Sequence, residues 1–310
     1  MSESKYNYSV IIPHFTSDGN VDLLKRAVKS VPDRTDIQVI VVDNSHTPIP
    51  QDLFPERNNV KIIYSSNERK AGGARNVGMD ESDAKWYLFL DADDFFTHQA
   101  FEVFDSHKDS INDLEFSLPT SVYSDNIYQK ANRDEPYASY IREFINTGDD
   151  TVLRQSFLAP VCKMVRSKMV KENNIRYDEV PASNDMMFAL KTGLAANSVG
   201  ADARETYVWT VSRGSITRTK SLENLESQFY VAQRMNKFLK ERGYKKKASQ
   251  MYFILQSAKF GVKPFCKLLF TSIKDGNIFI GWKNWIKTYM RLYSKKAKED
   301  NERYNINDNK

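Results

Sequence analysis

Three aspartates follow an apolar segment in WYLFLDADDFF, residues 86–96. Asp91, Asp93 and Asp94 lie within four positions, so their charges repel one another unless a cation joins them. Residues two apart in an extended chain point to the same side, so Asp91 and Asp93 can face one ligand. Mg²⁺ and Mn²⁺ prefer oxygen ligands and are often held by one or two carboxylates together with substrate phosphates. The stretch predicts such a metal site, with an Asp-rich turn as the structural alternative.

Two further carboxylates and one arginine are candidates for the same chemistry. Asp43 ends a second apolar segment, where it could hydrogen-bond a nucleotide base or ribose, or cap the local backbone. The stretch NERKAGGARNVG, residues 67–78, lacks G-x-G-x-x-G but offers backbone N–H groups and Arg75, which suits phosphate or carboxylate and could offset the acidic charges. Asp185 stands at an expected helix start, where the helix dipole favours an ionised carboxylate that could serve as a general base.

The elements that position these residues alternate between strand and helix. Apolar, β-branched stretches predict strands at 8–13, 37–43, 60–65 and 85–91, and helical spacing predicts helices at 22–31, 73–82 and 183–197. Such alternation is typical of an α/β fold with a mainly parallel sheet and helices on both faces. Ligands bind outside the carboxyl ends of the strands in such sheets, which is where the aspartates are expected. Residues 105–160 show no regular pattern.

Taken in order, SVIIPHFTS, VIVVDNS, AGGARNVGM, YLFLDADD and SNDMMF resemble glycosyltransferase family 2, over about residues 7–217. The resemblance implies the GT-A fold, a Rossmann-like sheet with flanking helices, and inverting transfer of a sugar from a nucleotide diphosphate, usually UDP. It makes Asp185 the catalytic base, and Asp91 and Asp93 the metal-binding residues. Asn184 departs from the Glu that often precedes the base. The implied nucleotide-sugar-binding residues are Pro13, His14, Phe15, Asp43, Asn67, Gly73, Arg75, Asp91 and Ala92.

Charge divides the chain into two parts. We predict a catalytic domain over 1–220 and a basic, aromatic-rich helical region over 221–310. Residues 236–310 carry about 18 Lys and Arg against about six Asp and Glu, although the whole chain has a net charge of only +5. Helices that interleave lysines with aromatic residues are typical of membrane interfaces, and packing on the catalytic domain is the alternative. No motif supports a nucleic-acid partner.

Cysteine usage and hydropathy set the expected location. Two cysteines make no disulfide framework, which favours a reducing compartment. The first residues lack the layout of a signal peptide, and no apolar stretch reaches about 18 residues. We therefore expect a cytoplasmic enzyme, peripheral on the inner face of the plasma membrane, that uses Mn²⁺ or Mg²⁺ to glycosylate a glycan or lipid-linked glycan in polysaccharide biosynthesis. A nucleotidyltransferase, or a membrane-associated protein with a vestigial nucleotide-sugar site, are the alternatives.

Overall fold

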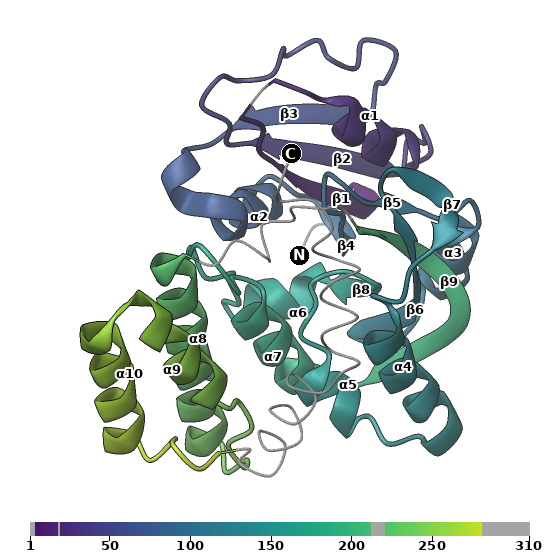
Figure 1. Cartoon of the computed structure of the whole chain (residues 1–310). Coiled ribbons are helices and arrows are strands. Elements are labelled where there is room, and N and C mark those ends of the chain that lie inside the picture. The colour runs from purple at the N-terminus through teal and green to yellow at the C-terminus, as the bar shows by residue number, and fades with distance from the viewer. Residues whose placement is uncertain (1–3, 18, 212–220, 281–310) are drawn as a thin grey trace. The chain divides into compact units, whose positions relative to one another are not determined.

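The structure is a computed structural model that describes residues 4–17, 19–211 and 221–280 (Figure 1). The chain forms two compact units. The first comprises Met1–Val180 and Asn184–Ser212, and the second comprises Pro181–Ser183 and Arg213–Lys310. Of the basic helical region predicted over 221–310, residues 281–310 lie outside the described residues.

The first unit is built on a mixed sheet flanked by helices. The strands are β1 (Tyr6–His14), β2 (Ile37–Asp43), β3 (Val60–Tyr64), β4 (Ala84–Phe89), β5 (Phe95–Phe96), β6 (Leu114–Tyr123), β7 (Asn126–Lys130), β8 (Lys163–Arg166) and β9 (Val199–Val211). The helices are α1 (Asp22–Lys29), η1 (Asn67–Arg69), α2 (Lys70–Asp80), α3 (Ala100–His107), α4 (Glu135–Thr147), α5 (Thr151–Ser156), α6 (Ser167–Glu172) and α7 (Met186–Ala195).

The strand order is β3-β2-β1-β4-β8-β6-β9-β5, with β7 paired to β6. The first four strands of this order are parallel, so their carboxyl ends meet at one edge. Strand β6 is also parallel to β9, whereas β8 runs antiparallel to both β4 and β6. The α/β prediction is confirmed, with the antiparallel pairs in the half of the sheet for which the sequence showed no clear pattern.

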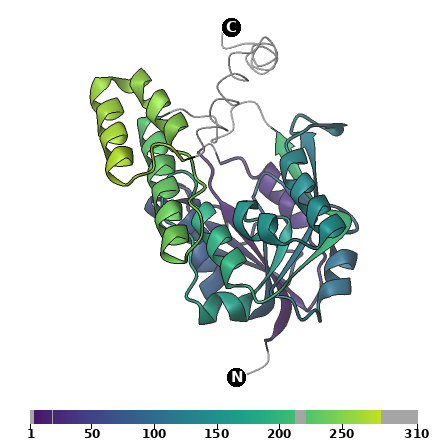
Figure 2. The ribbon, with the colours of Figure 1, turned by 90° about the horizontal axis from the view of Figure 1, so that it is seen from below.

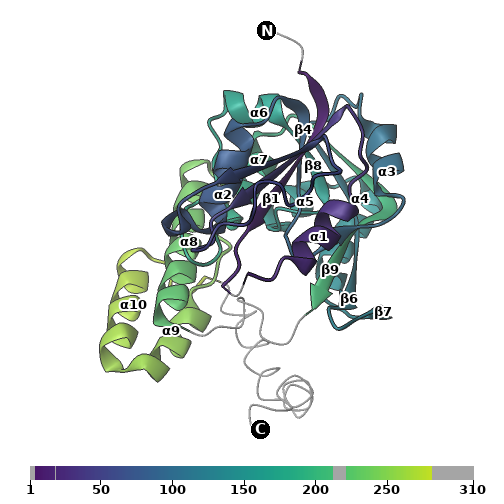
Figure 3. The ribbon, with the colours of Figure 1, turned by 90° about the horizontal axis from the view of Figure 1, so that it is seen from above.

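Successive side chains of β2 point to opposite faces of the sheet. Both faces of the parallel strands are covered by helices, so the side chains on each face pack against a helix. Val39 and Val41 belong to the main core together with Leu24 of α1. Ile40 and Val42 form a separate cluster with Ala74 of α2. Figure 3 shows α1 and α2 on opposite sides of β1. This arrangement explains why the apolar stretch at 37–43 is uninterrupted, and it brings the start of α2 to the carboxyl edge of the sheet.

The second unit is helical in its described part. Its elements are α8 (Leu222–Glu241), α9 (Met251–Ser257), η3 (Ala258–Phe260) and α10 (Val262–Lys274), and Figure 2 shows α8, α9 and α10 as neighbouring helices. Phe229, Ile254 and Leu268 form its buried cluster. The helical conformation is interrupted between α9 and α10 at Gly261. Its φ of 117° lies in a region that residues with a Cβ rarely adopt.

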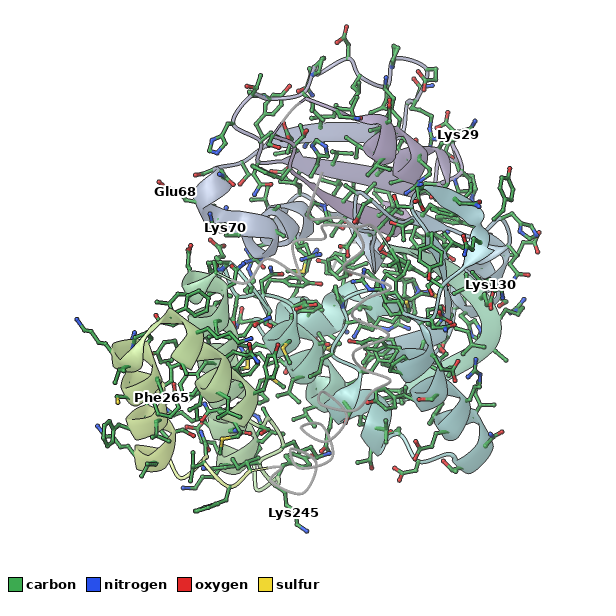
Figure 4. The ribbon with its side chains drawn as sticks, in the orientation of Figure 1. Lys29, Glu68, Lys70, Lys130, Lys245 and Phe265 are labelled. Carbon is green, nitrogen blue, oxygen red and sulfur yellow. The ribbon has the colours of Figure 1, made fainter. Side chains whose placement is uncertain are left out.

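Much apolar surface of this second unit remains exposed. Val262, Phe270 and Phe279 are 78%, 65% and 79% exposed. Phe265 lies on α10 and joins the buried cluster, while Lys245 extends away from the helices (Figure 4). Among the described helices, none combines the length and the apolar character that crossing a membrane requires.

Candidate active site

The third aspartate of the acidic motif is part of the fold. Asp94 is buried and accepts hydrogen bonds from the Tyr207 hydroxyl (2.8 Å) and the Thr210 backbone N–H (2.7 Å), both on β9. The Tyr207 hydroxyl also accepts a hydrogen bond from the backbone N–H of Asp91 at 3.2 Å. Burial, together with the charges of Asp93 and Asp91, raises the pKa of Asp94 well above its ordinary value. Asp94 therefore ties the turn after β4 to β9.

Arg75 is the cation that joins the acidic motif. Its Nη2 donates to Asp91 Oδ1 at 2.6 Å, and its Nη1 donates to Asn184 Oδ1 at 3.0 Å. The guanidinium lies 5.3 Å from the ring centroid of Tyr177, and its Nε has no hydrogen-bond partner among the described residues. Arg75 is 6% exposed, so it is not the surface arginine of the structural alternative. It connects the acidic motif to the residue that precedes Asp185.

Asp93 differs from both of its acidic neighbours. Its backbone carbonyl accepts hydrogen bonds from the Thr210 hydroxyl (2.7 Å) and from Arg26. The carboxylate is hydrogen-bonded by none of the described side chains, and the residue is exposed. Desolvation by the surrounding protein and the charge of Asp91 nevertheless raise its pKa. Asp93 is thus the carboxylate of the motif that remains available to a ligand.

A metal at this motif would have few protein ligands. Within the described ranges, no group of three His, Cys, Asp or Glu side chains could hold a metal ion. Asp93 offers a carboxylate that no described side chain binds, and Asp91 has one oxygen beyond that bonded to Arg75. A site of one or two carboxylates completed by phosphate oxygens is a common arrangement for Mg²⁺. The residues fit an ion bound together with a diphosphate, and they do not form a cage of their own.

Asp43 is fully engaged by protein donors at the ends of β1 and β2. Its carboxylate lies 3.0 Å from His14 Nδ1 and accepts hydrogen bonds from the Ser45 hydroxyl (2.6 Å) and the Ile49 backbone N–H (2.9 Å). Burial opposes ionisation, but these hydrogen bonds outweigh it and lower the pKa of Asp43 to about 2. These contacts match the structural alternative for Asp43, and its predicted contact with a nucleotide base stays a prediction.

The other predicted nucleotide-binding residues lie near the same edge. Phe15 is 46% exposed, and its ring meets that of His46 edge-on at 6.0 Å between centroids. Asn67 Nδ2 lies 3.1 Å from His46 Nε2. His46 therefore joins two predicted residues, although its spacing in the sequence gave no signal. Pro13 precedes His14 in β1, and Ala92 is partly buried against the main core.

The glycines before Arg75 permit a close approach between α2 and the segment before Asp185. A Cβ on Gly72 would lie 2.0 Å from the backbone oxygen of Asp178, and one on Gly73 would lie 2.3 Å from the Arg69 Cβ. In this structure, Gly73 therefore acts through packing of α2. Its predicted contact with the nucleotide sugar stays a prediction.

Asp185 is the N-cap residue of α7 but does not act as a capping side chain. Burial and the charge of Asp91 raise its pKa, while Arg75 and Lys163 work in the opposite direction. The expectation that the helix dipole would govern its ionisation is therefore wrong, because desolvation is the larger effect here. No described side chain hydrogen-bonds to its carboxylate. Asp185 thus lies among the charges of the acidic motif with its oxygens available.

The structure groups the predicted residues in two places. His14, Asp43, Phe15 and Asn67 lie at the ends of β1 and β2 and in the loops that follow. Arg75, Asp91 and Asp185 form a second group, linked through Asn184. Several side chains near these two groups were not predicted, because they lie in segments with no local pattern or in apolar stretches. They are His46, Tyr137, Lys163, Tyr177 and Tyr207.

Comparison with known proteins identifies the family and the fold. The model of the family described as Glycosyl transferase family 2 matches residues 9–173. The poly(ribitol-phosphate) β-N-acetylglucosaminyltransferase TarS of Staphylococcus aureus is 24% identical over 216 residues, which cover 66% of this chain and 36% of that protein. The chain thus spans little more than a third of the length of this relative.

Two further comparisons cover more of the chain. A cholesterol galactosyltransferase of Borreliella burgdorferi is 22% identical over 305 residues, 94% of this chain and 81% of that protein. The crystal structure of S. aureus TarS 1–349 in complex with UDP-GlcNAc superposes with a TM-score of 0.58 at 20% identity, over 85% of this chain and 72% of that one. The fold is therefore the expected GT-A fold, and the chain belongs to glycosyl transferase family 2.

Proposed function

We propose that this protein is an inverting, metal-dependent glycosyltransferase that moves one sugar from a UDP-sugar to the hydroxyl group of an acceptor. The observation that carries the proposal is the bridge formed by Arg75, which bonds Asp91 of the acidic motif and Asn184 next to Asp185. A donor diphosphate at the motif and a base on the other side of the sugar are what in-line displacement requires. The related TarS structure was solved with UDP-GlcNAc, which supports a UDP-sugar as donor.

Asp185 is the proposed general base. It would take the proton of the acceptor hydroxyl as that oxygen attacks the anomeric carbon. A carboxylate whose pKa is raised above its ordinary value is a stronger base, and efficient proton transfer needs a pKa that approaches the working pH. The charges of Arg75 and Lys163 favour the ionised form, which is the form that accepts a proton.

Asp93 and the second oxygen of Asp91 are the proposed ligands of Mn²⁺ or Mg²⁺. An ion held there would supply positive charge to the leaving diphosphate. Arg75 orients Asp91 through a charge-assisted hydrogen bond of 2.6 Å. Asp94 stabilises the acidic motif, because its hydrogen bonds attach the turn after β4 to β9.

We further propose an acceptor at a membrane surface on the cytoplasmic side, with a lipid or lipid-linked glycan as its class. The relative that matches 94% of this chain is named a cholesterol galactosyltransferase, while the match to TarS covers 66%. The second unit exposes Val262, Phe270 and Phe279 in a basic region, and such surfaces partition into anionic lipid interfaces. Co-sedimentation with phosphatidylglycerol vesicles, but not with phosphatidylcholine vesicles, is the expected result. If the protein pellets with neither kind of vesicle, the proposed membrane contact would be contradicted.

Release of UDP from a panel of UDP-sugars tests the activity itself. UDP-GlcNAc, UDP-glucose and UDP-galactose are incubated with the protein and Mn²⁺, with or without a lipid extract as acceptor. We expect UDP release from one donor, stimulated by the extract and abolished by EDTA. Release that persists in EDTA would contradict the metal dependence, and no release from any donor would contradict the donor class.

A further inference from the structure

Lys163, the first residue of β8, carries an ammonium group into the core of the first unit. The residue is 3% exposed. Its Nζ lies 5.4 Å from the ring centroid of Phe116 and 5.2 Å from that of Phe157. Its Nζ forms no hydrogen bond with an oxygen atom of the described residues. In the described part of the chain, two aromatic faces are therefore the close contacts of the ammonium group.

Other buried charges of this unit are hydrogen-bonded to protein groups. Arg75 bonds Asp91, Asp43 bonds Ser45 and the Ile49 backbone, and Glu115 accepts hydrogen bonds from Ser110 and Asn112. An ammonium in the interior without an oxygen partner is costly, and two aromatic faces offset only part of that cost. Burial accordingly lowers the pKa of Lys163 to about 8. An apolar side chain of the same length would suit the fold better, so stability does not explain the lysine.

The position of Lys163 relates it to the acidic motif and to Asp185, the proposed base. Strand β8 runs antiparallel to β4 with Met164 opposite Leu88, so Lys163 lies beside the last residue of β4, two positions before Asp91. The Phe157 ring that contacts Lys163 also contacts Tyr137 at 4.9 Å. Burial and the charge of Asp185 raise the pKa of that tyrosine to about 12, and the same carboxylate acts on Lys163. The charge of Asp185 thus acts on Lys163, and the strand register places Lys163 beside the strand that leads to the acidic motif.

The backbone before Lys163 adopts an unfavourable conformation. Cys162 is buried with a φ of 62°, in the left-handed region that residues with a Cβ rarely occupy. Its carbonyl accepts a hydrogen bond from the Ser117 backbone N–H at 3.1 Å, which holds the conformation. Strain of this kind is often kept where a neighbouring side chain must point in a particular direction. Here the neighbouring side chain is that of Lys163.

We propose that Lys163 binds the sugar that is transferred, by donating hydrogen bonds to its hydroxyl oxygens. This inference rests on the proposed function. An ammonium has three donors and no acceptor, so its partner must be rich in oxygen atoms. A general base must lie close to the anomeric carbon and to the attacking hydroxyl, and the charge of that base acts on Lys163. The nucleoside of the donor has its predicted partners at the ends of β1 and β2, and β4 separates those strands from β8.

The test compares ligands with and without the sugar. The variant Lys163→Met removes the ammonium and keeps the length of the side chain, and Lys168→Met makes the same change at an exposed position of α6. Affinities for UDP and for UDP-GlcNAc, UDP-glucose and UDP-galactose are measured by calorimetry with Mn²⁺, together with melting temperatures. We expect Lys163→Met to lose about tenfold or more in affinity for the preferred UDP-sugar and to keep its affinity for UDP. Its melting temperature should equal or exceed that of the natural protein.

Three outcomes would overturn the inference, namely an unchanged affinity for the UDP-sugar, an equal loss for UDP, or a lower melting temperature without a selective loss. If the natural protein binds none of these ligands, the proposed donor class fails. The melting temperature then still decides the role of Lys163. A lower value for Lys163→Met than for Lys168→Met would mean that the ammonium serves the fold, and a higher value would support a ligand role.

Discussion

Two groups of charged residues near the same edge of the sheet differ in how many hydrogen bonds the protein gives them. In the Asp43 cluster (His14, Asp43, Ser45 and Ile49), protein donors occupy the carboxylate completely. In the Asp185 cluster (Arg75, Asp91, Lys163 and Asp185), Lys163 and Asp185 form no hydrogen bond with a described side chain, and Arg75 Nε has no hydrogen-bond partner in the described part of the chain. A closed network maintains a shape, whereas open polar groups in the interior are costly unless a ligand completes them. The difference is the reason for which we propose that the first cluster serves the fold and that the chemistry takes place at the second.

The largest effect on the transfer rate should come from a substitution in the Asp185 cluster. Asp185→Asn keeps the size of the side chain and removes the proton acceptor, so we expect the transfer rate to fall by about 10²- to 10⁴-fold. The affinity for UDP should change little, because the base contacts the acceptor and not the nucleotide. Steady-state rates of the variant and of Asp52→Asn, which alters an exposed loop residue, provide the measurement and its control. A variant with its rate intact would remove Asp185 from the mechanism.

The acidic motif allows the same comparison within two adjacent residues. Asp94→Ala leaves the Tyr207 hydroxyl and the Thr210 N–H without their acceptor, at a cost of about 1–3 kcal/mol for each buried donor. Asp93→Ala removes a carboxylate that binds no described side chain, so its stability should remain close to that of the natural protein. Thermal unfolding of both variants measures the difference. Equal melting temperatures would mean that the two aspartates do not have separate roles.

The pH dependence of the free energy of unfolding distinguishes the Asp43 cluster from the Asp185 cluster. The folded-state pKa of Asp43 lies at about 2, below its ordinary value, so its ionised form stabilises the fold above about pH 4. We expect Asp43→Asn to cost about 2 kcal/mol at pH 7, with a cost that shrinks as the pH falls from about 4 to 2. Denaturant unfolding of the two proteins across this range gives the measurement. A cost that is independent of pH would show that the charge of Asp43 is not what stabilises the cluster.

The smallest of these effects concerns the pH dependence of the rate. Burial raises the pKa of Asp185, so the base loses its proton at a higher pH than an ordinary aspartate with a pKa of about 3.9. The rate should therefore rise with pH through a midpoint above that value. Measuring kcat between pH 4 and 8 locates the midpoint, and a midpoint at or below about 3.9 would contradict the assignment.

Local pattern was enough to predict the part of the fold that carries the predicted nucleotide-binding residues of β1 and β2. Residues 37–43 are β-branched and apolar throughout because helices cover both faces, and the strand has those bounds. The helix expected at 73–82 begins earlier, at Lys70, because Gly72 and Gly73 lie inside the helix and pack against other segments. Strand β6 was missed, since Ser, Thr and Pro interrupt its pattern. Its longest pairing is with β9, about 85 residues away in the sequence.

The site was predictable only where its residues are neighbours in sequence. Asp91 and Asp93 follow a recognisable strand, and Arg75 follows two glycines. The division of roles within the acidic motif was not predictable, because it depends on Tyr207 and Thr210, more than 100 residues further along the chain. Lys163 gave no signal either, since a single lysine in an apolar strand has no pattern until its neighbours are known.

Calorimetric titration of UDP into the protein, with and without Mn²⁺, tests the central claim most directly. The claim is that the open charges beyond β4 hold a metal-bound diphosphate. It predicts binding that requires Mn²⁺ in the natural protein, that is lost in Asp93→Ala, and that persists in Asp52→Ala. Binding of equal strength without the ion, or in Asp93→Ala, would contradict it.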